Sequence, residues 1–399
     1  MTIAAYAPAL RDTRWSVVSV VVGAGIVTAI QVGKAAIATP LLQADLGLDL
    51  AAAGWLTGIF AVLGLVGGIP AGTLVARAGD RRILVLGLAS VALGAITGAT
   101  APGYTVLLAS RVLEGFGFLL VTVAGPAILN RVVRDGQRDI ALALWSCFMP
   151  AGMALAMIVG PLFGDWRMLW WASAGLAAAA IMAGLTMIPA APARIAVSWR
   201  RTVSDAMRVL TSGGPVLLAV CFAFYSLIFF ALFSFLPVLL MEQMKIAHGT
   251  AGLLGALTTG ANIIGNLGAG YLLARGASRS SILFGAYLIM GLAGLGIFSQ
   301  AFGHMPTFLL CLLFSSVGGM IPATLISSAP LLAPSAALAS VAIGLVMQGS
   351  NLGQVIGPVA VGGAIETFGW TAAAGIVAIA ALIAAAVAVF IRSDHNPTG

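Results

Sequence analysis

The stretch GTLVAR at residues 72–77 returns as GYLLAR at residues 270–275, in a chain of 399 residues. The two copies lie 198 residues apart, and each is followed in register by another arginine, Arg81 or Arg279. Apolar matches occur easily in this chain, but charged residues make up only 8% of it, so the matching arginines are informative. A repeat of half the chain length in a hydrophobic protein indicates a duplicated membrane architecture.

The composition excludes an ordinary soluble protein. Hydrophobic residues make up 61% of the chain, and the mean hydropathy is +1.09. A soluble domain cannot bury so large a share of apolar side chains. Apolar stretches that approach the ~20 residues needed to cross a bilayer core occur at twelve places: 16–37, 53–75, 83–101, 105–129, 140–163, 168–190, 214–241, 251–273, 281–303, 306–330, 340–363 and 371–391. Continuous runs favour helices over the alternating strands of a barrel. We therefore predict an all-α integral membrane protein, with twelve transmembrane helices in two pseudo-symmetric six-helix bundles.

The positive charges predict how the chain is oriented. If the N-terminus is cytoplasmic, fifteen arginines lie on the inner side of the spans, and only Arg167 and Lys245 lie outside. This is the positive-inside pattern, so the net charge of +7 reports membrane orientation. Because the arginines are scattered over short loops, they do not form the basic face that nucleic acid requires. We expect a multi-pass protein of the inner (plasma) membrane with both termini cytoplasmic.

The longest polar interval divides the chain near its middle. We predict an N-terminal six-helix bundle at 1–190, a cytoplasmic linker at 191–213 and a C-terminal six-helix bundle at 214–399. Apolar residues recur at helical spacing from Trp199 to Leu210, which fits either a short helix on the inner leaflet or an ordinary solvated linker. The three cysteines all fall within spans, so we expect no disulfide.

Several motifs resemble those of the major facilitator superfamily. Residues 72–82 resemble that family's glycine-led, basic loop between the second and third helices. The segment RVLEGFG at 111–117 resembles its fourth-helix motif, and the glycines and proline of 152–164 resemble its fifth-helix motif. The resemblance covers nearly the whole chain and is specific for the superfamily, but not for a substrate. It implies solute transport by alternating access about a site between the halves.

The resemblance also implies a set of gating residues at the two loop motifs: Gly72, Arg77, Asp80, Arg81, Gly270, Arg275 and Arg279. In the family, an aspartate four residues after the first glycine helps to lock the outward-facing state. Ala76 and Ala274 stand at that place in this chain, and Asp80, four residues further on, is the candidate replacement. The alternative is that these arginines only anchor the loops on the cytoplasmic side.

Three ionisable residues fall inside the predicted spans: Lys34, Arg111 and Glu114. A charge at bilayer depth costs at least ~2.5–3.5 kcal/mol, so such residues face a partner or a wet cavity. Lys34 lies six residues before Pro40 and Arg111 six residues into its span, which places both roughly 9 Å from the outer boundary. Glu114 follows Arg111 by three residues, so it lies one turn deeper on the same face.

The second half has no counterpart of these charges, since Ile228 and Ala231 occupy the positions equivalent to Gln31 and Lys34. It offers aromatic residues and a polar stripe instead. One interpretation is a site that holds an anionic group on the two cations and packs an organic body on the aromatic rings. Its residues would be Gln31, Lys34, Arg111, Tyr225, Phe229, Gln348 and Asn351. The other interpretation pairs Arg111 structurally with Glu114 and lets Lys34 snorkel to the outer surface.

These patterns predict a secondary active transporter of a small organic anion. An enzyme is not expected because HExxH, GxSxG and P-loop motifs are absent. The predicted driving force is a proton or other ion gradient without a cofactor, and Glu114 is the candidate proton carrier.

Alternatives are a proton-driven drug or metabolite efflux antiporter, a non-transporting sensor, and a Cu(I) transporter suggested by Met149, Met153 and Met157. Methionines more often serve packing, so we expect no metal site, and we expect a monomer in the bilayer. Substrate, direction and coupling stoichiometry stay open.

Overall fold

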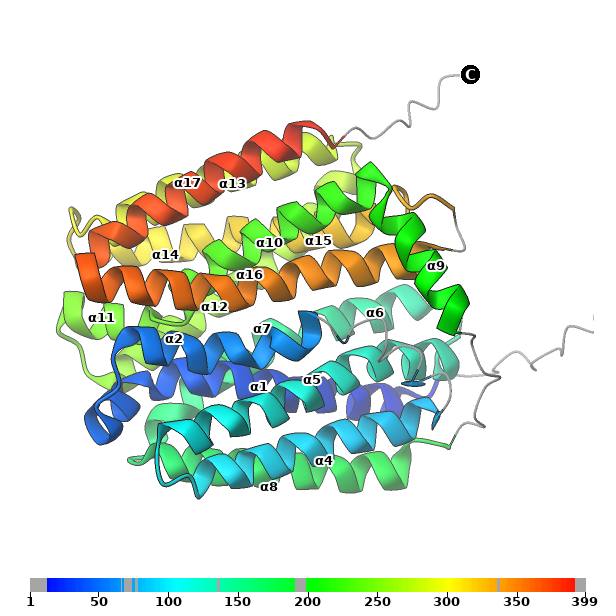
Figure 1. The fold of residues 1–399 in the computed structure, drawn as a ribbon, viewed down its shortest axis with the longest axis horizontal. Coiled ribbons are helices and arrows are strands. Elements are labelled where there is room, and N and C mark those ends of the chain that lie inside the picture. Colours follow the sequence, from blue (N-terminus) through cyan, green and yellow to red (C-terminus); the bar gives the residue numbers. More distant parts are fainter. Residues whose placement is uncertain are drawn as a thin grey trace, which may run out of the picture.

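Long helices packed side by side make up the chain (Figure 1). The structure is a computed structural model that describes residues 13–65, 67, 74–75, 78–134, 137–190, 199–335 and 338–391. Within those residues every regular element is a helix. The all-α fold predicted from the apolar runs is confirmed.

The first half and the linker contain these elements in chain order: α1 (Trp15–Leu46), α2 (Leu50–Gly58), η1 (Ile59–Ala61), α4 (Asp80–Ala99), α5 (Tyr104–Val132), α6 (Arg138–Ser146), α7 (Phe148–Val159), η3 (Gly160–Leu162), α8 (Trp166–Met187) and α9 (Trp199–Leu210). The second half contains α10 (Gly213–Phe233), α11 (Leu236–Met244), α12 (His248–Ala274), α13 (Arg279–Phe298), α14 (His304–Gly318), α15 (Met320–Ser328), α16 (Ala339–Phe368) and α17 (Trp370–Val389).

The second half repeats the order of the first. Helices α12, α13 and α14 begin about 200 residues after α2, α4 and α5 respectively. The breaks differ: α1 is one continuous helix where α10 and α11 are interrupted at Ser234, and α16 is continuous where α6 and α7 are interrupted at Cys147. In Figure 1 the first half (blue to green) and the second half (green to red) form two layers of helices, and α9 runs between them at one end.

One hydrogen bond at the other end of the molecule is repeated as well. Trp166 Nε1 donates to Asp45 Oδ2 at 2.9 Å, which links the start of α8 to the end of α1. Trp370 Nε1 donates to Glu242 Oε2 at 2.9 Å, which links the start of α17 to α11. We call these two bonds the indole–carboxylate ties. In each half, a tie joins the first span to the last, as expected for pseudo-symmetric bundles.

Nine helical segments of the described chain are long and apolar enough to cross a membrane. Helices α12 and α16 are 27 and 30 residues long but are not among them, because glycine, threonine, asparagine and glutamine dilute their apolar residues. The apolar stretch Leu50–Leu65, which contains α2, is shorter. These three segments all pack against the opposite half, where small and polar side chains replace lipid-facing ones. The structure is thus consistent with the twelve predicted spans.

The two halves meet through α2 on α16 and through α7 on α12. A Cβ on Gly54 would collide with the backbone of α16, and one on Gly58 would lie 2.8 Å from the carbonyl oxygen of Val355. On the other side of the interface, a Cβ on Gly252 would collide with the carbonyl oxygen of Met157. Glycine is required where two helix backbones approach this closely. These contacts involve α2, in the first part of the apolar stretch Leu50–Leu65, and the first turns of α12, so the halves are closed on each other at that end.

The first helix is longer than predicted. Span 16–37 was expected to end before Pro40, but α1 continues to Leu46, and Gly47 ends it in the left-handed conformation with φ +62°. Pro40 has no N–H to donate, yet one missing hydrogen bond does not end a helix that is packed among others. Lys34 therefore lies twelve residues before the helix end, or ~18 Å. Pro40 therefore does not mark the end of this helix, and the depth of Lys34 in the membrane stays a prediction.

The linker is helical where the structure describes it. Helix α9 covers the residues whose spacing predicted a helix, and it contacts α10 and α16. Its position on the inner leaflet stays a prediction, as do the domain limits 1–190, 191–213 and 214–399.

Candidate functional site

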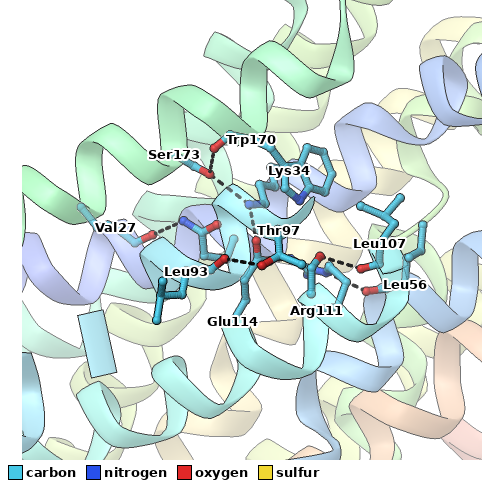
Figure 2. A network of polar contacts seen from close by, with 12 residues as sticks. Val27, Lys34, Leu56, Leu93, Thr97, Leu107, Arg111, Glu114, Trp170 and Ser173 are labelled. Atoms are coloured by element: carbon cyan, nitrogen blue, oxygen red, sulfur yellow. Dashed lines mark hydrogen bonds and ion pairs between the residues drawn. The ribbon is translucent and has the colours of Figure 1, made fainter. Parts of the chain in front are cut away.

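The three charged residues inside the predicted spans meet within the first half (Figure 2). Lys34 Nζ lies 2.6 Å from Glu114 Oε1, and Arg111 Nη1 pairs with Glu114 Oε2. All three side chains are completely buried. One carboxylate thus lies between an ammonium on α1 and a guanidinium on its own helix, α5. We call these three residues the buried triad.

The neighbouring helix makes room for the triad. Arg111 and Glu114 share a face of α5 because they are three residues apart. Helix α4 packs on this face, and a Cβ on Gly94 would lie 2.7 Å from Glu114 Cγ. A Cβ on Gly98, one turn further, would collide with the Trp170 ring. Two glycines on α4 therefore permit a carboxylate and an indole to lie at this depth.

Lys34 has further partners on α8. Its Nζ donates to Ser173 Oγ at 3.0 Å and lies 4.4 Å from the centroid of the Trp170 ring. An ammonium group is well matched to a carboxylate, a hydroxyl and an aromatic face. Sequence reasoning missed both α8 residues, although their spacing of three places them on one helix face.

Arg111 is held on the other side of Glu114. Its Nε donates to the carbonyl oxygen of Leu56 at 3.0 Å, and its guanidinium lies 4.8 Å from the centroid of the Phe60 ring. The buried Nη2 of Arg111 and the buried Nε1 of Trp170 have no hydrogen-bond partner. A buried donor left unpaired costs about 1–3 kcal/mol. Two spare donors therefore lie beside a group of side chains whose net charge is positive.

The structure pairs Arg111 with Glu114, as the second interpretation expects, but the position of Lys34 differs from that interpretation. Lys34 does not reach the surface, since its side chain is buried and paired. Neither cation is free, because Glu114 holds both. Gln31, one turn before Lys34, is also buried; its Nε2 donates to the carbonyl oxygen of Val27 at 3.0 Å, and its Oε1 has no partner. The structure therefore describes a closed form of this site.

The predicted aromatic surface lies on α10. The rings of Tyr225 and Phe229 are stacked with centroids 5.7 Å apart, and Phe229 stacks on Phe233 with centroids 6.0 Å apart. The Tyr225 hydroxyl accepts a hydrogen bond from Asn262 Nδ2 of α12 at 3.2 Å. All four side chains are buried. Asn262 was missed because one amide in a glycine-rich helix has no distinguishing pattern.

The polar stripe of α16 faces different neighbours. A Cβ on Gly64 in the first half would lie 2.6 Å from Asn351 Nδ2, so Asn351 lies at the interface between the halves. Gln348 is half-buried. Gln354 is buried and its Nε2 has no partner. Neither Gln348 nor Asn351 hydrogen-bonds to the buried triad.

Comparison with known proteins identifies the family. The sequence profile of the Major Facilitator Superfamily (MFS) matches residues 21–342. The chain belongs to this superfamily. The 3-(3-hydroxy-phenyl)propionate transporter of Escherichia coli K12 is 26% identical over 364 residues, which cover 88% of this chain and 86% of that protein. The tetracenomycin C resistance and export protein of Streptomyces glaucescens is 27% identical over 189 residues, which cover 46% of this MFS chain and 35% of that protein.

A solved structure has the same fold. The bacterial homologue of the human lysosomal transporter Spinster, in an inward-facing and occupied conformation, matches with a TM-score of 0.73 and 17% identity. The match covers 95% of this chain and 94% of that one. The resemblance that the sequence motifs indicated is thus confirmed, and this chain is an MFS transporter with membrane-spanning helices.

The first MFS loop motif contains an ion pair. Gly72 and Arg77 lie outside the described residues. Asp80, at the start of α4, accepts two hydrogen bonds from Arg131 in the last turn of α5, at 2.8 and 3.0 Å. Arg131 also donates to the carbonyl oxygen of Pro189, beyond the end of α8, at 3.1 Å. Asp80 is therefore the acid of a charge pair, and its partner lies 51 residues away, where no local pattern points to it.

The second MFS loop motif is built differently. Arg81 of the first motif donates to a backbone carbonyl near the end of α8. Arg275 lies 4.3 Å from the centroid of its neighbour Tyr271, and Arg279 begins α13; neither makes an ion pair with a described residue. A Cβ on Gly270 would meet nothing within 4 Å, so packing does not require a glycine there. The gating role of both motifs stays a prediction.

The methionines proposed for Cu(I) lie on α7, and Met157 packs between the halves. Met153 and Met157 are buried in the apolar core. The carbonyl oxygen of Met157 lies against Gly252 of α12, and its flexible side chain packs on Gly255.

Proposed function

We propose that this MFS protein is a proton-coupled secondary active transporter of a small organic anion. The charge of the buried triad carries the proposal. Two cations share one carboxylate, all three side chains are fully buried, and the net charge is therefore positive. Arg111 Nη2, within the triad, and Trp170 Nε1, on the residue that lies against Lys34, are buried donors without a partner. A substrate carboxylate would be attracted by this charge and would take the place of Glu114 between the two cations.

Proton coupling follows from competition for the two cations. A substrate carboxylate that binds Lys34 and Arg111 takes the partners of Glu114. A buried carboxylate without its cations binds a proton more readily. Anion and proton together then leave the net charge of the site as it was when empty. The empty and the loaded forms then bury the same net charge. This favours symport, because neither form has a larger desolvation cost than the other.

The class of anion is suggested by α10 and by a relative. The stacked rings of Tyr225, Phe229 and Phe233 offer an apolar surface suited to a planar organic body. The Escherichia coli relative is named for transport of an aromatic carboxylate, and its match spans most of both chains. We therefore propose an aromatic carboxylate as the substrate class.

Efflux by proton antiport is the second candidate, because the Streptomyces glaucescens relative is a resistance and export protein. In an antiporter, substrate and proton exclude each other from the site, whereas in the proposed symporter they bind together. The pH dependence of substrate binding separates the two: proton uptake on binding indicates symport, and proton release indicates antiport.

We further propose that the protein works as a monomer in the inner membrane, with the α9 end and both termini in the cytoplasm. The excess of arginine at the predicted inner loops supports this orientation.

Binding by purified protein tests the anion site. Wild-type protein should bind benzoate or phenylacetate and should not bind the matching amides. Lys34→Gln and Arg111→Gln should each weaken binding of the acids by at least tenfold, since each removes a charge-assisted contact. Arg167→Gln is the matched control, because Arg167 is a partly exposed cation paired with Asp45 at 2.7 Å. Equal binding of an acid and its amide would contradict an anion site.

Uptake into proteoliposomes tests the coupling. An inward proton gradient should drive saturable accumulation, and a protonophore should abolish it. Glu114→Gln should abolish accumulation while exchange at equal pH continues. Accumulation by this variant on a proton gradient would exclude Glu114 as the proton carrier.

A further inference from the structure

Two side-chain hydrogen bonds cross from one half of the molecule to the other, at the end where α2 and α12 begin. His248 Nε2, on the first residue of α12, lies 2.7 Å from the carbonyl oxygen of Ile37 on α1. The carboxylate of Glu366, near the end of α16, accepts a hydrogen bond from the backbone N–H of Leu50 at 3.2 Å. We call these two the cross-half bonds. Neither can persist when the halves separate at this end.

The first cross-half bond is made on a turn of α1 that a proline interrupts. A carbonyl oxygen only accepts, so His248 Nε2 carries the hydrogen. Ile37 lies three residues before Pro40, which removes one backbone hydrogen bond from this part of the helix. Side chains of neighbouring helices compensate such interruptions in membrane proteins. A Cβ on Gly252 would lie 3.3 Å from the Ile37 side chain, so the backbone and the side chain of Ile37 both meet α12.

The second cross-half bond caps a helix of the opposite half. Leu50 is the first residue of α2, and its N–H is one of those that a helix leaves without an internal partner. Asp49, the residue before it, accepts from the N–H of Ala52 at 2.7 Å. Glu366 therefore supplies a second carboxylate at a helix start that favours negative charge. A Cβ on Gly362, one turn before Glu366, would collide with the Leu50 carbonyl oxygen, so a glycine permits this approach.

Both bonds lie on helices that hold the cations of the buried triad. Ile37 follows Lys34 by one turn on α1, toward the predicted outer end. Leu50 lies on α2 six residues before Leu56, whose carbonyl oxygen accepts from Arg111. A route from the outer side to the triad between the halves therefore passes the cross-half bonds.

We propose that His248 and Glu366 form a two-point latch that holds the predicted outer end of the transporter shut, and that both points release together. The indole–carboxylate ties brace each half at this end, so the halves separate as rigid bodies and break both bonds in one step. Two independent bonds that oppose one opening equilibrium multiply their effects on it. The latch does not depend on the chemical class of the substrate.

The reactivity of a buried cysteine measures the opening. Met157→Cys introduces a reporter on the side of the interface where α7 meets α12, in full-length protein whose three natural cysteines are replaced by alanine. A membrane-impermeant thiol reagent is applied outside intact cells, without substrate. The reporter reacts only when the outer end opens, so its rate follows the open fraction when opening and closing are fast. Thr250→Cys, at an exposed position, is the reference reporter.

The variants separate the latch from general loosening. His248→Leu removes the donor of one cross-half bond, and Glu366→Ala removes the acceptor of the other. His248→Gln is the rescue, because the glutamine amide keeps an N–H donor. Asp49→Ala is the matched control, since it removes a cap of α2 that stays within the first half. The reference reporter should react at one rate in all variants, which shows that each is folded and inserted.

Both single variants should raise the rate at position 157. We expect an increase of about threefold to tenfold for each, the effect of one hydrogen bond. Glu366→Ala should do so although its bond lies on the α2–α16 side of the interface, away from the reporter. The double variant should show the product, about tenfold to hundredfold. His248→Gln and Asp49→Ala should stay within about twofold of the parent protein, less than one hydrogen bond.

Three results would overturn the latch. An unchanged rate in His248→Leu would show that this bond does not hold the end shut. A rise in His248→Leu with none in Glu366→Ala, or a double variant no faster than the faster single one, would show that the two points do not release together. An equal rise in Asp49→Ala would assign the effect of Glu366→Ala to a loosened α2.

Discussion

Replacing Glu114 should destabilise the protein far more than replacing Lys34. Glu114→Gln leaves Lys34 and Arg111 as two buried cations without a counter-charge, and breaking a buried pair in this way costs about 3–5 kcal/mol. Lys34→Met leaves Arg111 and Glu114 as a balanced pair that is still hydrogen-bonded. Lys34→Met removes the net positive charge from an apolar environment. It should therefore lower the free energy of unfolding by less than about 1.5 kcal/mol.

The same reasoning predicts a rescue. In the Glu114→Gln background, Lys34→Met removes one of two like charges, so the double variant should be more stable than Glu114→Gln alone by about 1–3 kcal/mol. Unfolding in mixed micelles, followed by tryptophan fluorescence, gives the free energies of unfolding. Asp45→Asn is the control: its partner Arg167 lies at a similar distance, 2.7 Å, but both side chains are at least one-third exposed, and such pairs contribute about 0–1 kcal/mol.

Two outcomes would refute this account of the triad. The first is a loss of stability in Glu114→Gln no larger than in the Asp45→Asn control, which would mean that water or lipid headgroups already compensate the cations. The second is a double variant no more stable than Glu114→Gln alone, which would mean that the two cations do not share the carboxylate. A stable Lys34→Met variant that no longer binds aromatic acids would separate the ligand role of Lys34 from any structural one.

Three further predictions test the interface, the gate and the orientation. Gly54→Val should abolish transport without preventing folding, because the valine side chain would collide with the backbone at Pro358 and keep the two halves from closing on each other. Uptake measures transport, and the size-exclusion profile of the purified variant reports folding. Arg131→Lys should impair transport although it keeps the charge, because lysine cannot make the two parallel bonds to Asp80; a rate equal to wild type would exclude this pair from gating. Arg279→Cys should resist a membrane-impermeant thiol reagent applied outside intact cells, and labelling there would contradict the predicted topology.

The sequence was sufficient for the fold and for part of the site. Apolar runs located the helices because a membrane span needs a continuous length of apolar residues. The spacing of Arg111 and Glu114 predicted one shared face, since helical geometry is local. The contact between Lys34 and Glu114 could not be predicted, because their separation of 80 residues is closed only by packing of α1 on α5.

The misses also have physical causes. Pro40 was read as a helix end, but neighbouring helices hold α1 together through it. His248 was passed over because its partner, Ile37, lies 211 residues away in the other half. Such a contact depends on how the two halves pack, which no local pattern of residues records.

The indole–carboxylate ties have a mechanical consequence for transport. Each tie joins the first and last spans of one half at the same end, so each half is a closed ring of helices with no loose edge there. A rocking motion must then change the contacts between the two halves rather than the packing of helices within each half. Asp45 and Glu242 differ in length by one methylene, yet both bonds measure 2.9 Å. The two halves thus have the same joint, although an aspartate forms it in one half and a glutamate in the other.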